Sequence, residues 1–218
     1  MNNVLNRVGG WKNYVPTPDG MRDVIKKKYV TTDIQTLIIY GDAYNGERRF
    51  VKDIAPLLRG RNQIETCKNV WDFVKLNVKY IKDDLNNDKV KTANVTLFDG
   101  YGDCKSMTLL TGAILRELGI PYKIRFASYD GTNRVSHVYL IALADGKDTI
   151  IDAVYWYFNQ EITFSYFEDY YVFGSRYKPN MEKSGVNGIV KPNATGVGKI
   201  LLFSFLALTL YAWQQGKD

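Results

Sequence analysis

Residues 63–80 show the clearest helical pattern in the first half of the chain. Apolar side chains recur there at steps of three and four residues, which is the spacing of one face of an α-helix; they are Ile64, Cys67, Val70, Trp71, Val74 and Val78. We therefore expect a helix that faces the core. Upstream, a helix is predicted over residues 33–44 and another over 46–58, where Pro56 limits the regular part.

A further helix is predicted after residue 102, with clear signals at both ends. Asp103 is a good N-cap residue, Gly119 suits the left-handed position at a C-terminus, and Pro121 prevents continuation. Between these ends runs an apolar stripe, which consists of Met107, Leu110, Ala113, Ile114 and Leu118. The pattern predicts a helix that packs one face on the core.

The next fifty residues alternate with the period of β-strands. Strands are predicted over 122–129, 135–143 and 149–153, separated by turns at 130–133 and 144–147. In the second strand His137, Tyr139 and Ile141 fall on one face. The order, a helix followed by an antiparallel meander, is typical of an α+β fold.

Composition narrows the class of protein. Of the 218 residues 45% are hydrophobic and 24% charged, which indicates a globular chain. The net charge is +6, but the basic residues are scattered, with the densest run at 26–28, so we expect a solvated surface and no specific nucleic acid binding. Two cysteines and one histidine exclude a disulfide framework and leave too few ligands for a Cys/His zinc site.

Three residues in the central part of the chain suit thiol chemistry. Cys104 lies in the first turn of its predicted helix, where free N–H groups and the helix dipole favour a negatively charged sulfur. His137 lies on a strand, and Asp152 lies on the strand that the next hairpin pairs with it. Cross-strand partners in a hairpin have Cβ atoms roughly 5 Å apart. The hairpin therefore brings Asp152 or its neighbour close to His137, where a carboxylate can orient the imidazole.

Several spaced blocks around these residues resemble the core of the transglutaminase-like superfamily. They are TLFDGYGDC at 96–104, LRELGIP at 115–121, SHVY at 136–139 and ID at 151–152, preceded by the helix that contains residues 70–80. The resemblance covers about residues 63–155. Within this superfamily, the chain is similar in particular to transglutaminase-like proteins encoded among the structural genes of bacteriophages and prophages.

The resemblance implies a papain-like α+β fold with the nucleophile at the N-terminus of a helix on an antiparallel sheet. It makes Cys104 the nucleophile, His137 the base and acid, and Asp152 the orienting carboxylate. The backbone N–H of Cys104 would be one oxyanion-hole donor. The second donor is left open among three residues, which are Asn94, Tyr101 and Trp71.

One departure from the family concerns the strand that carries the histidine. Val138 and Tyr139 stand where many members have Ala and Trp, which predicts an altered aromatic wall on the acyl-acceptor side. Downstream, residues 155–177 hold eleven aromatic side chains. Such a band can bind sugars or partners, but we favour the interpretation that it closes a core.

The pattern divides the chain into four parts. They are a partly helical N-terminal extension (1–62), a transglutaminase-like core (63–180), a flexible linker (181–199) and a hydrophobic C-terminal helix (200–218). Residues 200–213 are almost entirely apolar, and the stretch from Lys199 to Lys217 would span roughly 27 Å as a helix, close to a bilayer core of about 30 Å. Burial in a membrane is the favoured interpretation, and packing against a virion protein or the domain itself is the alternative.

The leading hypothesis is a cysteine hydrolase or acyltransferase that acts on an amide bond in a peptide, a protein or peptidoglycan. Its expected location is a membrane or a phage virion, or otherwise the cytoplasm. No cofactor is implied, because thiol acyl transfer needs none. The alternative hypothesis is a structural protein of a virion or membrane assembly that keeps the fold without catalysis.

Overall fold

The computed structural model describes residues 10–20, 24–26, 34–83, 89–173, 182–185 and 188–190. Within them lie helices and strands in the following order: η1 (Gly10–Tyr14), β1 (Val24–Lys26), α1 (Ile34–Arg48), η4 (Ala55–Leu58), α2 (Gln63–Asn77), β2 (Lys79–Tyr80), β3 (Lys89–Lys91), α3 (Ala93–Asp99), β4 (Tyr101–Gly102), α4 (Cys104–Leu118), β5 (Tyr122–Ser128), β6 (His137–Ala144), β7 (Lys147–Ile151), β8 (Tyr166–Phe173), β9 (Glu182–Gly185) and β10 (Gly188–Val190).

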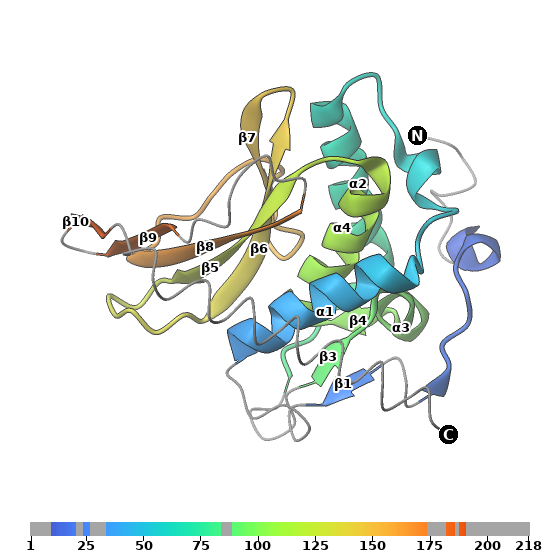
Figure 1. Cartoon of the computed structure of the whole chain (residues 1–218), viewed down its shortest axis with the longest axis horizontal. Coiled ribbons are helices and arrows are strands. Elements are labelled where there is room, and N and C mark those ends of the chain that lie inside the picture. Colours follow the sequence, from blue (N-terminus) through green and yellow to red (C-terminus); the bar gives the residue numbers. More distant parts are fainter. Residues whose placement is uncertain are drawn as a thin grey trace.

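Helices and sheet form two layers, which confirms the predicted α+β class. The main sheet has the order β10-β9-β8-β5-β6-β7, and all its neighbouring strands are antiparallel. The helices α1, α2 and α4 lie together on one side of it (Figure 1). The main core lies between the layers, where buried side chains of α4 meet those of β5 and β6.

Local sequence signals set both ends of α4. At its start the Asp103 side chain accepts a hydrogen bond from the Ser106 N–H at 3.1 Å. At its end Gly119 adopts φ +72°, and its N–H binds the Arg116 carbonyl at 3.1 Å. The predicted caps are thus confirmed. The helix is buried well beyond the predicted stripe, Thr108 and Thr111 included, because helices and the sheet surround it.

The helix α2 matches its predicted pattern. Asn62 caps it by accepting the Glu65 N–H at 2.8 Å. Cys67 and Val70 are fully buried, as the apolar stripe predicts. The helix α1 likewise confirms the prediction over residues 33–44.

The predicted helix over residues 46–58 is wrong. Instead α1 runs on to Arg48, and Arg49 then takes a left-handed conformation (φ +52°) that ends it. Turns follow, and only Ala55–Leu58 coil again, as a short 3₁₀-helix with Pro56 in its first turn. Since Pro56 has no N–H and clashes with the preceding turn, it fits the start of this short helix but not the interior of a longer one.

Polar side chains lock α1 and β5 onto α4. The Tyr122 hydroxyl donates to the Asp42 carboxylate at 2.5 Å, and Arg116 binds the other oxygen of the same carboxylate. A Cβ atom at Gly112 would lie 2.8 Å from the Asp42 carboxylate, so this helix position has room only for glycine. These contacts hold the C-terminal half of α4 in place behind the site.

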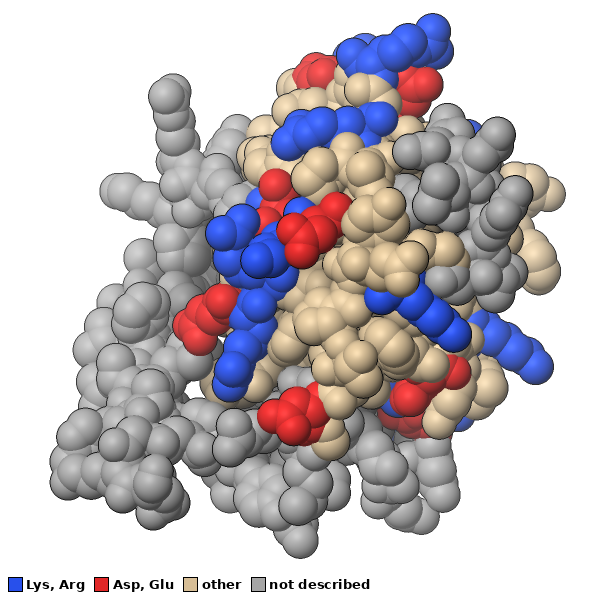
Figure 2. Space-filling view, turned by 90° about the vertical axis from the view of Figure 1, so that its right-hand side faces the viewer, with Lys and Arg blue, Asp and Glu red and all other residues tan. Residues whose placement is uncertain are grey.

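Charged side chains of both signs are mixed on the face of the molecule that Figure 2 shows. Lys and Arg lie among Asp and Glu and do not gather in a single basic patch (Figure 2). Ion pairs of this kind join Arg49 to Glu117 and Lys68 to Asp72, both at 2.8 Å. Basic residues are thus dispersed on this face of the molecule, as they are along the sequence.

Several sequence predictions fall on residues that the structure does not describe. The hydrophobic segment 200–218 lies entirely outside the described residues, and its helix stays a prediction. Within the predicted linker 181–199 the structure shows the short strands β9 and β10. In the described ranges, no helix is both long and apolar enough to cross a bilayer.

Candidate active site

Cys104 is the first residue of α4 and is half-buried. The first N–H groups of a helix have no partner within it, so the N–H of Cys104 is available to a ligand. Two residues upstream, a Cβ atom at Gly102 would lie 2.6 Å from the Ser106 Cβ. Only glycine fits at that position, which explains the glycine of the GDC motif and lets β4 pass close to the first turn of α4.

His137 begins β6, beside the first turns of α4. The hydroxyl of Thr108, one helical turn after Cys104, donates to the Val138 carbonyl at 3.0 Å. His137 Nε2 lies 2.7 Å from Asp152 Oδ2. Since Nε2 is engaged by the carboxylate, the other ring nitrogen is left for the hydrogen bond between His137 and Cys104. The structure therefore brings all three predicted residues together.

Asp152 follows β7 directly, and it is held from both sides. Its Oδ1 accepts the Val154 N–H at 2.9 Å, and its carbonyl accepts the indole N–H of Trp71 at 2.8 Å. The hairpin pairs Ile151 with Leu140, so Asp152 comes next to His137 diagonally and not directly across. A diagonal neighbour on the same face is still within reach of a side chain.

The charge state of His137 depends on these contacts. Burial on its own lowers the pKa of the imidazole. Hydrogen bonds to Asp152 and Cys104, together with the charges of both groups, outweigh burial and raise the pKa of His137 to about 10. The imidazole therefore lies between the Asp152 carboxylate and the Cys104 sulfur.

Cys67 provides the contrast within the same chain. It is fully buried on the core side of α2. Burial, and to a smaller degree the charge of Asp145, raise the pKa of the Cys67 thiol to about 12. This cysteine is a core residue, as its place on the apolar stripe predicts.

The three residues left open for the second oxyanion donor lie in different surroundings. The Trp71 indole N–H is already bound to the Asp152 carbonyl, so Trp71 fixes the carboxylate residue instead. Asn94 is buried in α3 and accepts a hydrogen bond from Thr92 at 2.6 Å. Tyr101 is exposed and has the Lys91 ammonium 3.7 Å from its ring centre. Among the described residues, no hydrogen bond joins the Trp71 or Tyr101 side chain to Cys104.

Tyr80 lies close to the candidate site, and sequence reasoning did not single it out. It pairs with Gly102 in the parallel pair of β2 and β4, two residues before Cys104. Burial and the nearby charges of Cys104 and Asp103 raise the pKa of Tyr80, which keeps its hydroxyl protonated as a donor. Its side chain is 43% exposed, and within the described part of the chain its hydroxyl has no hydrogen-bond partner. The only feature of the sequence that could have indicated Tyr80 is its position just after a core helix.

Two tyrosines flank the imidazole. The ring centres of Tyr139 and Tyr129 lie 5.5 Å and 6.1 Å from that of His137. They provide an aromatic wall where the sequence departs from the family at residues 138–139. The downstream aromatic band closes the core only in part, because Tyr170 packs on the core whereas Trp156 is 78% exposed.

Comparison with known protein families finds a match in the central part of the chain. Residues 53–148 match the model of the Transglutaminase-like superfamily, which is less than half of the chain. The match includes Cys104 and His137 and ends before Asp152. No curated protein matches the chain. In the ranges that the structure describes, no group of three or more His, Cys, Asp or Glu side chains could hold a metal ion.

Solved structures offer only distant similarities. A candidate cysteine protease from Cytophaga hutchinsonii is 20% identical, with a TM-score of 0.42 over 60% of this chain and 48% of its own. A candidate protease from Parabacteroides distasonis is 14% identical, with a TM-score of 0.45 over 72% and 30%. A TGase is 15% identical, with a TM-score of 0.38 over 62% and 37%.

This chain therefore spans less than half the length of each of these three proteins, and TM-scores below 0.5 support no argument about its activity. The family match is independent of them. It covers the α4 helix, the β5 strand and the β6 strand, which carry the half-buried cysteine and the histidine beside it. Residues 53–148 are thus similar to the transglutaminase-like superfamily.

Proposed function

We propose that the protein is a cysteine-dependent enzyme that cleaves an amide bond and passes the acyl group to water or to an amine. The observation that carries this proposal is the contact of His137 with Asp152 at 2.7 Å, with Cys104 hydrogen-bonded to the same imidazole. A thiolate beside a protonated imidazole is the ground state that thiol acyl transfer requires.

The first half of the reaction forms a thioester. The Cys104 sulfur donates an electron pair to the amide carbonyl carbon, and the carbonyl π electrons move to the oxygen, which becomes an oxyanion. As this intermediate collapses, the C–N bond breaks and the imidazolium of His137 gives its proton to the leaving nitrogen. The amine departs, and the acyl group stays on sulfur.

The second half restores the enzyme. The neutral imidazole of His137 takes a proton from water or from an acceptor amine, which attacks the thioester carbon. The C–S bond then breaks, and the sulfur leaves as a thiolate beside the imidazolium. Asp152 keeps the ring in one orientation throughout, because its other oxygen is anchored on the Val154 N–H. The acid or the new amide is released.

Tyr80 is proposed as the second oxyanion donor, next to the backbone N–H of Cys104. Replacing it by Tyr80→Phe removes one donor and is expected to lower kcat by about 100- to 1,000-fold. The rate at which iodoacetamide alkylates Cys104 should stay unchanged, because alkylation forms no oxyanion. Tyr101→Phe is the matched control, since Tyr101 lies on the neighbouring strand with an exposed ring. Equal loss of turnover in both variants would contradict this role.

The proposal is tested by the products formed from glutamine-containing peptides and from peptidoglycan fragments, with and without an added amine. Mass spectrometry should find a free acid, a new amide or both with the full chain. Cys104→Ala is expected to abolish these products and to stay folded, whereas Cys67→Ala should retain them. Turnover by Cys104→Ala at the rate of the full chain would refute the proposal.

The place where the enzyme acts remains a prediction from residues 200–213. Their apolar sequence favours attachment to a membrane or to a virion protein. The chemistry proposed above does not depend on this attachment.

A further inference from the structure

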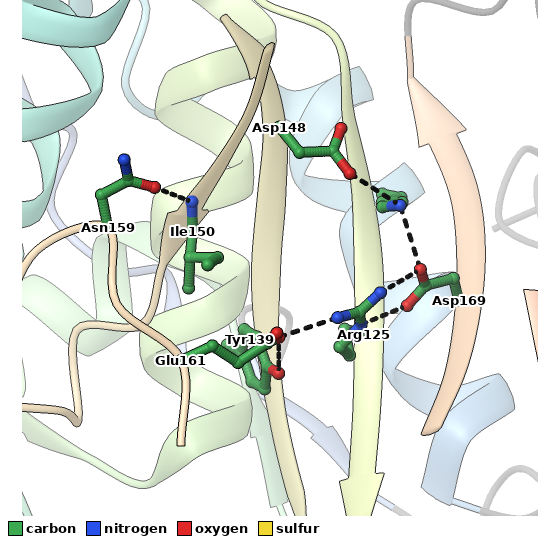
Figure 3. Close-up of polar contacts among 8 residues, drawn as sticks. Arg125, Tyr139, Asp148, Ile150, Asn159, Glu161 and Asp169 are labelled. Atoms are coloured by element: carbon green, nitrogen blue, oxygen red, sulfur yellow. Dashed lines mark hydrogen bonds and ion pairs between the residues drawn. The ribbon is translucent and has the colours of Figure 1, made fainter. Parts of the chain in front are cut away.

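A buried ionic cluster lies on the face of the sheet opposite the main core (Figure 3). In the strand register Arg125 on β5 stands between Asp169 on β8 and Tyr139 on β6. Its Nε and Nη2 each donate to one oxygen of the Asp169 carboxylate at 2.7 Å, and its Nη1 donates to Glu161 Oε1 at 2.8 Å. Asp169 is fully buried, and Arg125 is 8% exposed.

Stability alone is a poor account of this cluster. Removing two charges from water is costly, and apolar side chains of similar volume often serve a fold equally well. Apolar side chains already pack against this position, because the rings of Phe167 and Phe164 have their centres 4.1 Å and 5.3 Å from the Arg125 guanidinium. What charged pairs add is fixed geometry, since the two parallel hydrogen bonds to a carboxylate allow one orientation.

The cluster is connected to the imidazole through hydroxyl groups. The Tyr139 hydroxyl donates to Glu161 Oε1, the oxygen that also accepts from Arg125. Tyr129 is hydrogen-bonded to Tyr139 through their side chains. Both rings lie next to His137, which precedes Tyr139 by two residues on β6 and therefore shares its face. A continuous set of contacts therefore runs from the buried ions to the proposed proton carrier.

Glu161 also belongs to the segment that continues from Asp152. This segment is tied to the edge of the sheet, where the Ile150 N–H donates to Asn159 Oδ1 at 2.9 Å (Figure 3). The Asn159 N–H returns a hydrogen bond to the Ile150 carbonyl at 3.2 Å. Two residues later, Glu161 anchors the same segment on β5 and β6 through Arg125 and Tyr139. Glu161 thus joins the segment after Asp152 to Tyr139, which lies beside the imidazole.

We propose that Glu161 is a positioning residue for His137, which it orients by fixing the hydroxyl and the ring of Tyr139. The inference rests on the proposed function, in which His137 carries the proton. The charged and titratable groups that face the imidazole are Cys104 from α4, Asp152 after β7, Tyr129 after β5 and Tyr139 itself. Loss of the contact between Glu161 and Tyr139 lets the imidazole ring of His137 turn away from Cys104 and Asp152.

The test compares Glu161→Ala with Glu161→Gln, which keeps an oxygen that can accept from Tyr139. The chain has one histidine, so its imidazole signals in NMR report His137 alone. In Glu161→Ala the titration midpoint should fall by about one pH unit or more, and alkylation of Cys104 at pH 7 should slow by about tenfold. Glu161→Gln should restore both. Tyr139→Phe, which loses only the hydroxyl, should behave as Glu161→Ala and serves if that variant does not fold.

Lys123→Met is the control for a merely structural role. It breaks contacts with Asp169 at 3.1 Å and Asp148 at 3.2 Å within the same cluster, without touching Glu161. The proposal is overturned if the alanine variant loses as much thermal stability as Lys123→Met while its midpoint and alkylation rate stay as in the unaltered chain. A midpoint near 6.5, the ordinary value for histidine, in the unaltered chain overturns the proposed function and this inference together, because no held imidazolium would then exist.

Discussion

Iodoacetamide will modify Cys104 in the folded protein and leave Cys67 intact. An ordinary thiol is about 3% ionised at pH 7, and Cys104 is half-buried at the start of α4, beside the imidazole of His137. Cys67 has no exposed surface, and its pKa is raised to about 12. The two rates should therefore differ by about 1,000-fold or more at pH 7, because each unit of pKa changes the thiolate fraction about tenfold.

The measurement is peptide mass spectrometry of the alkylated protein at several times and at pH values from 5 to 9. Denatured protein is the control, since both thiols should then react at similar rates. His137→Ala should slow the reaction of Cys104 by about tenfold or more at pH 7, with no effect on Cys67. Equal labelling of both cysteines in the folded chain at every pH would contradict the thiolate–imidazolium pair.

Local signals account for the parts of the site that the sequence predicted. The cap at Asp103 and the stop at Gly119 are chemical properties of single residues, so the helix that starts at Cys104 could be placed to within one residue. The hairpin between β6 and β7 is also local. Its turn is tighter than the predicted 144–147, with Asp145 and Gly146 both at positive φ, so β6 ends later and β7 begins earlier than predicted.

Tyr80 was not predictable, because what places it is a pairing between distant segments. The strands β2 and β4 have two residues each, too short for any alternation to show in the sequence. Trp71 presents a similar case. Its position on the helical stripe indicated a core residue, and the family resemblance left it open as an oxyanion donor. Only the packing of α2 beside β7 brings its N–H to the Asp152 carbonyl.

The ionic cluster shows a further limit of periodic patterns. In β5 the residues that alternate with the apolar core face include Lys123 and Arg125, a pattern that normally indicates a face in water. Here the segment before β8 contributes Glu161 and Phe164 to the surroundings of Arg125, and both Lys123 and Arg125 are nearly buried with carboxylate partners. Alternation identified the two faces correctly, but it holds no information on which distant segment covers the second.

The imidazole of His137 is expected to titrate near pH 10, far above the 6.5 of an ordinary histidine. As the chain has one histidine, NMR can follow its ring signals without assignment ambiguity. Asp152→Asn removes the carboxylate charge and weakens the hydrogen bond at 2.7 Å. Burial then has the larger effect, so the midpoint in this variant should fall by several pH units, to about 6.5 or below. Unchanged midpoints in the two proteins would contradict the assigned role of Asp152.

The same titration has a consequence for stability. The folded chain binds the His137 proton more tightly than the unfolded chain, so the contribution to the free energy of unfolding is fully present below about pH 6.5. It declines as pH rises and is lost above about 10, at about 1.4 kcal/mol for each pH unit between the unfolded and the folded pKa. Urea unfolding at about pH 6 and about pH 10.5, on either side of this window, measures the loss. Asp152→Asn serves as the reference, because Lys and Tyr groups that titrate near pH 10 contribute to both proteins. A smaller decline in Asp152→Asn than in the unaltered chain is the expected sign, since the variant no longer holds the imidazolium that the rise in pH removes.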